Sequence, residues 1–181
     1  MAVLVEGISV VIRSDRLLAA FGGDWDAVRA VVPNETLCGD DELARAGFST
    51  HAEAETLVDR LAASGLIYVE DGAARDLVIV DQRRGPLVRC DWIEFGQATL
   101  DGDPAKRVSA CRLRGSTRPV TVTPEGWTFD GSLSARLPPA PEQRGVDRLA
   151  FVGSQGGYNI YRDRASGSHL FVSSAEWGGR T

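Results

Sequence analysis

The fold depends on "AVLVEGISVVI", residues 2–12. Most of its apolar residues are β-branched, and they alternate with smaller or polar ones. This pattern predicts one strand from Val3 to Ile12, and its apolar content places that strand at the centre of a sheet. We therefore expect the rest of the chain to pack around this strand.

Three amphipathic helices are predicted after it, over residues 15–21, 25–32 and 51–65. The third has the clearest apolar stripe, with spacing typical of a helix that lies on a sheet. That stripe consists of Ala54, Leu57, Val58 and Leu61.

Residues that cap helices precede each of these segments. Ser14 or Asp15 is expected to cap the first helix, Asp24 the second, and Ser49 or Thr50 the third. These polar side chains accept hydrogen bonds from backbone amides that have no partner within the helix.

Residues 36–48 allow two interpretations. One is a β-hairpin that turns at Gly39-Asp40-Asp41, and the other is a short helix over residues 41–46. With the helix, the segment 40–80 resembles a winged helix in its pattern. The exposed positions of its second helix are acidic, however, and would repel DNA, so a winged-helix-like DNA binder is only a minor alternative.

After residue 65 the pattern becomes almost entirely β, with turn signals at short intervals. The expected strands cover residues 66–70, 76–81, 87–95, 97–100, 108–113, 119–123, 127–129 and 146–153. A Pro-rich connector is expected over residues 137–145 and a terminal hairpin over residues 157–173.

The predicted fold class is therefore α+β, mostly antiparallel β, with two to three helices confined to the first 65 residues and a β-rich C-terminal half. The chain divides into an α+β half, residues 1–96, and a β-rich half, residues 97–181. A length of 181 residues also allows one compact domain.

The charges are unevenly distributed along the chain, whose net charge is −5. Between Glu35 and Asp59 there are seven acids and Arg45 as the single base, whereas Lys106 to Arg118 contains five bases and no acid. Either the two segments neutralise each other within the fold, or the acids form a partner-binding surface. The residues assigned to that surface are Asp40, Asp41, Glu42, Glu53, Glu55 and Asp59.

The composition disfavours several classes of protein. Three widely spaced cysteines and two histidines predict reduced thiols rather than disulfides, and no metal site. The lack of a leader or of a long apolar run predicts a soluble cytoplasmic protein. Among 20 basic residues only Lys106 is a lysine, an imbalance typical of a GC-rich bacterial genome.

The densest chemistry lies in "RCDWIEFG", residues 89–96. In a structural interpretation, residues 87–95 form one strand and Arg75 or Arg89 pairs with Asp91. In a functional one, an indole and an acid line a ligand site with help from the preceding turn. The candidate ligand-binding residues are Asp81, Arg83, Arg84, Trp92 and Glu94. The sequence leaves open whether the acids at positions 81, 91 and 94 converge.

The functional hypothesis favoured by the sequence is a non-enzymatic protein-binding module, of the inhibitor, immunity or adaptor type, with an acidic surface. Another protein or a second copy of the chain is the expected partner. Nucleic acid and membrane partners are disfavoured, and no cofactor is expected. The alternative is a small-molecule-binding protein or enzyme with a pocket between the two halves around Trp92 and Glu94.

Overall fold

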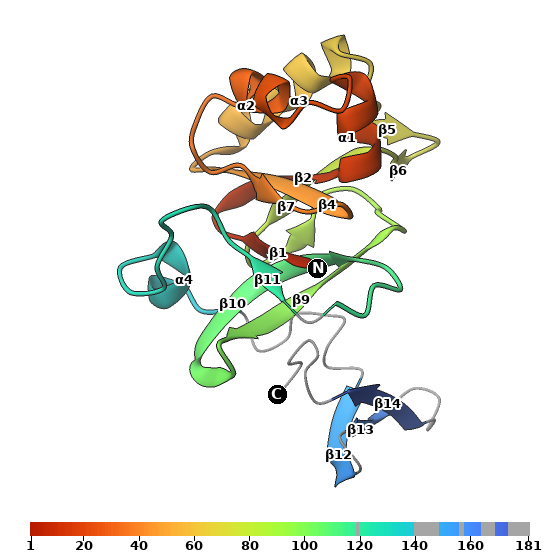
Figure 1. Ribbon diagram of the computed structural model, residues 1–181, viewed down its shortest axis with the longest axis vertical. Coiled ribbons are helices and arrows are strands. Elements are labelled where there is room, and N and C mark those ends of the chain that lie inside the picture. The colour runs from red at the N-terminus through yellow and green to blue at the C-terminus, as the bar shows by residue number, and fades with distance from the viewer. Residues whose placement is uncertain (119, 140–148, 156–157, 164–168, 174–181) are drawn as a thin grey trace.

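The computed structural model describes residues 1–118, 120–139, 149–155, 158–163 and 169–173. Three helices near the start of the chain, α1 to α3, form one layer. Beneath them lie two mostly antiparallel sheets, one below the other (Figure 1). The predicted α+β class is confirmed.

The stretch at residues 2–12 does not form one strand. It forms β1 (Ala2–Val5) and β2 (Ile8–Arg13), which belong to different sheets. The chain turns between them at Gly7, whose φ is +56°. A Cβ at this position would lie 2.7 Å from the carbonyl oxygen of Phe48, so this corner needs glycine. The prediction of one strand was wrong because strand propensity does not show where a strand leaves its sheet.

The first sheet has β2 at its centre, so the central position predicted for the strand Val3 to Ile12 holds for its second part alone. All pairs of neighbouring strands in this sheet are antiparallel. Its order is β3 (Cys38–Gly39), β4 (Leu43–Phe48), β2, β7 (Leu77–Asp81) and β8 (Gly85–Pro86). The hairpin interpretation of residues 36–48 is therefore correct and the helix interpretation is wrong. Every residue of β4 is buried, and strand alternation sends its side chains to two different cores.

The helices α1 (Ser14–Ala20), α2 (Trp25–Val31) and α3 (His51–Ala63) cover the outer face of this sheet (Figure 1). The predicted apolar stripe of α3 is buried in their shared core. That core also contains Ile8, Val10, Ile12, Leu17, Val28, Ala44, Ala46, Phe48, Leu77 and Ile79.

Two of the three predicted caps are confirmed. The Asp24 side chain accepts a hydrogen bond from the amide of Asp26, and Thr50 forms a capping box with Glu53. The cap of α1 was predicted wrongly, because its N-cap residue is Arg13, which makes no side-chain cap bond. Ser14 is instead buried, and its hydroxyl has no hydrogen-bond partner within the described part of the chain.

The second sheet packs against the inner face of the first. Its order is β11 (Thr121–Val122), β1, β10 (Asp103–Leu113) and β9 (Ile93–Leu100), with β11 parallel to β1 and the other pairs antiparallel. On β1, Val3 and Val5 contribute to the core between the sheets, and Ala2 and Leu4 to a core on the opposite face. The division at residue 96 stays a prediction. That position lies within β9, and β1 pairs with β10 from the other predicted half.

Several predicted strands are shorter or displaced. Within residues 66–70 only β5 (Val69–Glu70) forms, paired with β6 (Ala73–Ala74). Residues 87–95 are not one strand: β8 ends at Pro86, β9 begins at Ile93, and the chain between them bonds to β6 through the Arg89 carbonyl oxygen.

Residues 127–129 form no strand, because the Trp127 amide bonds back to the Pro124 carbonyl oxygen in a turn. A short helix, α4 (Leu133–Arg136), follows this turn and lies outside the first 65 residues to which helices were predicted to be confined.

A third sheet consists of β12 (Leu149–Gln155), β13 (Tyr158–Asp163) and β14 (His169–Ser173), all antiparallel. The antiparallel pair β13 and β14 lies within the range of the terminal hairpin predicted over residues 157–173. Its turn and most of the predicted connector 137–145 lie outside the described residues. Within the described part of the chain, none of the helices has the length and apolar character needed to cross a membrane.

Candidate functional site

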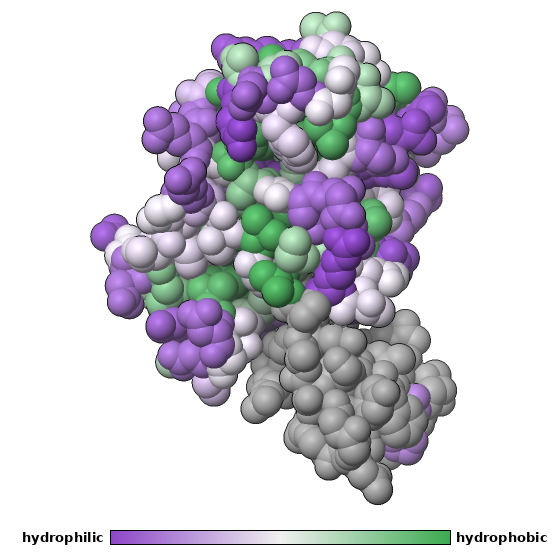
Figure 2. Space-filling model, viewed as in Figure 1, coloured by the Kyte–Doolittle hydropathy of each residue, from purple (hydrophilic) through white to green (hydrophobic). Residues whose placement is uncertain are grey.

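The acidic segment is divided by strand β4. Asp40, Asp41 and Glu42 form the turn before β4, at the end where β1 begins, whereas Glu53, Glu55 and Asp59 belong to α3 in the helix layer. On the face seen in Figure 2, hydrophilic residues gather over the end of the first sheet near the N-terminus, beside a strip of hydrophobic residues. The single acidic surface expected from the sequence is therefore two separate groups of acids.

Asp40 determines the shape of the turn. One of its carboxylate oxygens accepts hydrogen bonds of 2.9 Å from the amides of Glu42 and Leu43. Its own amide donates to the Leu43 carbonyl oxygen at 2.9 Å. The Asp40 side chain is only 6% exposed, so it functions as part of the backbone scaffold.

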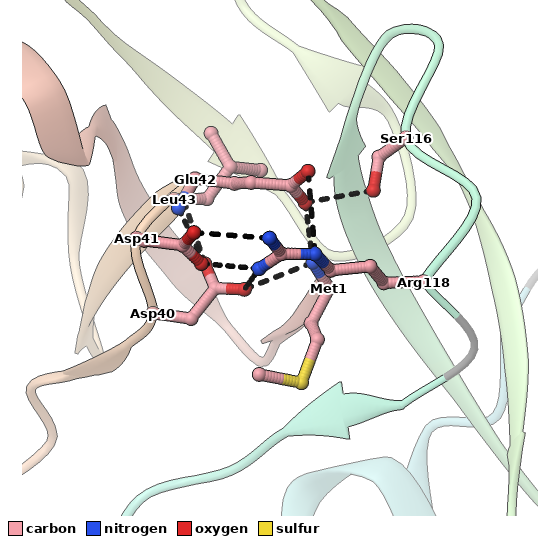
Figure 3. Close-up of polar contacts among 7 residues, drawn as sticks. All are labelled: Met1, Asp40, Asp41, Glu42, Leu43, Ser116 and Arg118. Carbon is pink, nitrogen blue, oxygen red and sulfur yellow. Dashed lines mark hydrogen bonds and ion pairs between the residues drawn. The ribbon is translucent and has the colours of Figure 1, made fainter.

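The amine of Met1 lies between two of the turn acids (Figure 3). It donates to the second carboxylate oxygen of Asp40 at 2.9 Å and to Glu42, whose carboxylate also accepts a 2.7 Å hydrogen bond from the Ser116 hydroxyl. Burial raises the pKa of Glu42, but the bonds from the amine and from Ser116, with the charges of the amine and Arg118, outweigh it and lower the pKa overall.

Arg118 completes this group from the loop before β11. Its guanidinium makes two hydrogen bonds to Asp41, one of them 3.0 Å long, and lies 3.7 Å from Asp40 and 3.9 Å from Glu42 (Figure 3). The hydrogen bond from Arg118 lowers the pKa of Asp41. The turn acids are therefore neutralised within the fold by the amine and by a base of the 106–118 segment, the first of the two alternatives that the charge pattern allowed.

The acids of α3 have a different environment. Glu53 caps its own helix, where its carboxylate accepts bonds from the amides of Ser49 and Thr50. Glu55 and Asp59 are exposed and one helical turn apart, and neither makes an ion pair among the described residues. Of the six residues assigned to the acidic surface, these two are free to meet a partner.

The predicted ligand residues fall into two places. Asp81, Arg83 and Arg84 share the turn between β7 and β8, where the Asp81 carboxylate accepts bonds of 2.8 and 3.0 Å from the amides of the two arginines. Both arginines are exposed. The sequence motif "DQRRG" is thus a turn that is closed by its own aspartate.

Trp92 and Glu94 lie elsewhere. The Trp92 ring packs against the core between the sheets, and its indole nitrogen donates to the Ala74 carbonyl oxygen at 3.0 Å. Glu94 pairs with Arg112, its neighbour across β9 and β10, at 2.6 Å. A structural partner therefore engages the polar atoms of each.

The acids at positions 81, 91 and 94 make separate interactions. Asp91 pairs with Arg89 at 3.3 Å, which confirms one of the two pairings considered for it. Phe95 contributes to the core between the sheets and faces Gly85 at the end of the β7–β8 turn, so its neighbour Glu94 points to the opposite face of the second sheet. The assignment of a ligand pocket to these residues stays a prediction.

Sequence reasoning missed a buried arginine. Arg45 is 3% exposed, and its guanidinium donates to the Ser9 hydroxyl at 3.0 Å and to the Glu6 carbonyl oxygen at 3.2 Å. Burial lowers its pKa, and among the described residues no carboxylate lies within ion-pair distance. Nothing in the residues around Arg45 indicates this burial, because arginine is rarely buried and a strand with both faces covered is decided by the packing of the two sheets.

A second missed feature is the network around Gln82. Its side chain accepts from the Gly7 amide at 2.8 Å and donates to the Leu137 carbonyl oxygen at 2.7 Å, and its carbonyl oxygen accepts from the Ser109 hydroxyl at 2.7 Å. Close by, the Glu6 carboxylate accepts from the Trp127 indole at 3.0 Å and from the Ser134 amide at 2.7 Å. These bonds hold residues 124–137 against the corner at Gly7.

The cysteines offer little nucleophilic chemistry, and all three are free thiols, as predicted. Burial raises the pKa of Cys38 to about 11 and also raises the pKa of Cys90 and Cys111, so all three are protonated at neutral pH. Among the described residues, no group of three or more His, Cys, Asp or Glu side chains is placed to hold a metal ion.

Comparison of the chain with protein-family models, with curated proteins and with solved structures found no match.

Proposed function

We propose that this protein is a non-enzymatic protein-binding module, of the inhibitor, immunity or adaptor type, and that the exposed face of α3 is its binding surface. The observation that carries the proposal is the state of Glu55 and Asp59, which are exposed, adjacent on one helix face and without an ion pair among the described residues. The partner that suits them presents a basic surface.

The contrast with the turn acids supports this choice. Asp40, Asp41 and Glu42 are engaged by Arg118 and the Met1 amine, so a partner that bound them would first have to break those bonds. Glu55 and Asp59 make no ion pair among the described residues that a partner would have to break. Exposed charges of this kind mainly increase the rate of association and the discrimination between partners, and the chain's net charge of −5 acts in the same direction.

The alternative functions have less support. A pocket around Trp92 and Glu94 would have to use an indole that already donates to Ala74 and a carboxylate that is paired with Arg112. The winged-helix pattern required a helix over residues 41–46, and residues 43–48 form the buried strand β4.

Charge reversal on α3 tests the proposal. The double variant Glu55→Lys and Asp59→Lys is compared with the wild type in capture experiments on a lysate of the source organism, at low and high salt. A second double variant, Glu125→Lys and Asp130→Lys, changes the same charge at exposed positions outside the helix layer.

The expected result is one stoichiometric partner that the wild type and the control variant retain at low salt. The α3 variant, and the wild type at high salt, should lose it. A partner that binds the α3 variant as tightly as the wild type, or no stoichiometric partner at all, contradicts the proposal.

A further inference from the structure

Three arginines lie within two residues of the contact between Gln82 and Ser109, which joins the β7–β8 turn to β10. Arg83 and Arg84 project from the β7–β8 turn, whose backbone is held by Asp81. Neither arginine makes an ion pair among the described residues. The turn therefore presents two positive side chains from a rigid backbone.

Gln82 fixes this turn against the second sheet. It is 3% exposed, its amide donates to the Gly7 carbonyl oxygen at 2.9 Å, and its carbonyl oxygen accepts from the Ser109 hydroxyl on β10 at 2.7 Å. One direct hydrogen bond, from Ser109 to Gln82, thus holds β10 against the turn.

Arg107 enters the same region from β10. The regular register from residue 107 onwards puts it on the same face as Ser109, two residues closer to the β9–β10 hairpin. Two residues of strand span about 6.6 Å, so Arg107 lies just beyond the contact between Ser109 and Gln82. Arg107 as a whole is half-buried, but its Nε is buried and has no hydrogen-bond partner among the described residues. A buried charged donor without an acceptor is costly, and an anion at this place would supply one.

Among the described residues, the carboxylates of Asp81 and Glu6 form no ion pair with these arginines and accept hydrogen bonds from neutral donors instead. One oxygen of Asp81 is occupied by the amides of the turn, and the carboxylate of Glu6 is occupied by Trp127 and Ser134.

We propose that Arg83, Arg84 and Arg107 form a binding site for an anion of the phosphate class that carries two or more negative charges. Guanidinium groups bind phosphate oxygens in a bidentate manner, and three of them match several oxygens around one or two phosphorus centres. A single carboxylate, with one charge and two oxygens, would leave part of the group unpaired. This site is separate from α3 and does not depend on the partner proposed for that helix.

Calorimetric titration with inorganic pyrophosphate, at constant low ionic strength, tests this proposal. The variants are Arg107→Gln and the double variant Arg83→Gln with Arg84→Gln. The control is the double variant Arg16→Gln with Arg29→Gln, which removes two exposed arginines of the helix layer that make ion pairs there. Thermal melts establish whether each variant is folded. If Arg107→Gln does not fold, the double variant Arg83→Gln with Arg84→Gln is the test of the site.

The expected result is saturable binding at one site that the control variant retains and that each site variant weakens by about tenfold or more, because each removes charge-assisted hydrogen bonds to the anion. A parallel titration with a nucleoside diphosphate distinguishes the sources. Equal affinity shows that the phosphates alone are recognised, and tighter binding shows that a nucleoside adds contacts, so both support the site. No saturable binding of either probe, or binding that the site variants leave unchanged, overturns it.

Discussion

The turn before β4 and the helix α3 after it both carry acidic residues that lie close together in the sequence. In the turn these acids are bonded within the fold, whereas on α3 two of them are left exposed. In the turn, Asp40 and Glu42 are mostly buried and bonded to the Met1 amine. On α3, Glu55 and Asp59 remain exposed without an ion pair among the described residues. A count of charges along the chain does not distinguish structural carboxylates from those available to a partner, but their burial and hydrogen bonds do.

The largest expected difference between the two groups is in folding stability. Asp40→Ala removes the acceptor of two backbone amides and one partner of the amine, and leaves those donors without it. The free energy of unfolding should fall by about 1–3 kcal/mol. Denaturation by urea measures it.

The matched control for this substitution is Glu55→Ala, which should change the free energy of unfolding by no more than about 0.5 kcal/mol. Equal losses in the two variants would show that the turn carboxylate is not structural.

The second difference concerns pH. The pKa of Glu42 is lowered in the folded protein, so its ionised form stabilises the fold above its ordinary pKa, about 4.3. That contribution should disappear as the pH falls from this value through the lowered pKa. Glu42→Gln should flatten the dependence of unfolding free energy on pH in this acidic window, whereas Glu55→Gln should leave it as in the wild type. Parallel curves for the wild type and Glu42→Gln would show that the bonds from the amine and Ser116 do not stabilise the ionised form.

The smallest effect on stability is expected on α3. The double variant Glu55→Gln with Asp59→Asn removes the charges with little change in size, and the melting temperature should hardly change because both side chains are exposed. Association with the partner should instead become slower and less sensitive to salt. A marked drop in melting temperature would mean that these acids are structural, like those of the turn.

The features that could be predicted from the sequence are those that depend on local pattern. The apolar stripe of α3 and its Thr50 cap follow from residue spacing within one helix, and the cap of α2 by Asp24 follows in the same way. The two strands of the terminal hairpin were likewise visible in the alternation of their residues.

The candidate site was less predictable because its properties arise between segments. Arg118 lies 77 residues from Asp41, and nothing in either neighbourhood indicates the pairing. The functional interpretation of the sequence has the Trp92 indole line a ligand site, whereas in the fold its ring packs on the core, because the chain leaves the sheet between Pro86 and Ile93.

The sequence by itself determined the α+β class, the positions of the early helices and the hairpin character of the C-terminal half. These follow from propensity and periodicity over short windows, which tertiary packing reinforced here. Only the tertiary structure decided that residues 2–12 serve two sheets and that three of the seven acids between Glu35 and Asp59 are neutralised internally. A corner at Gly7 and an ion pair across 77 residues are properties of segments brought together in space.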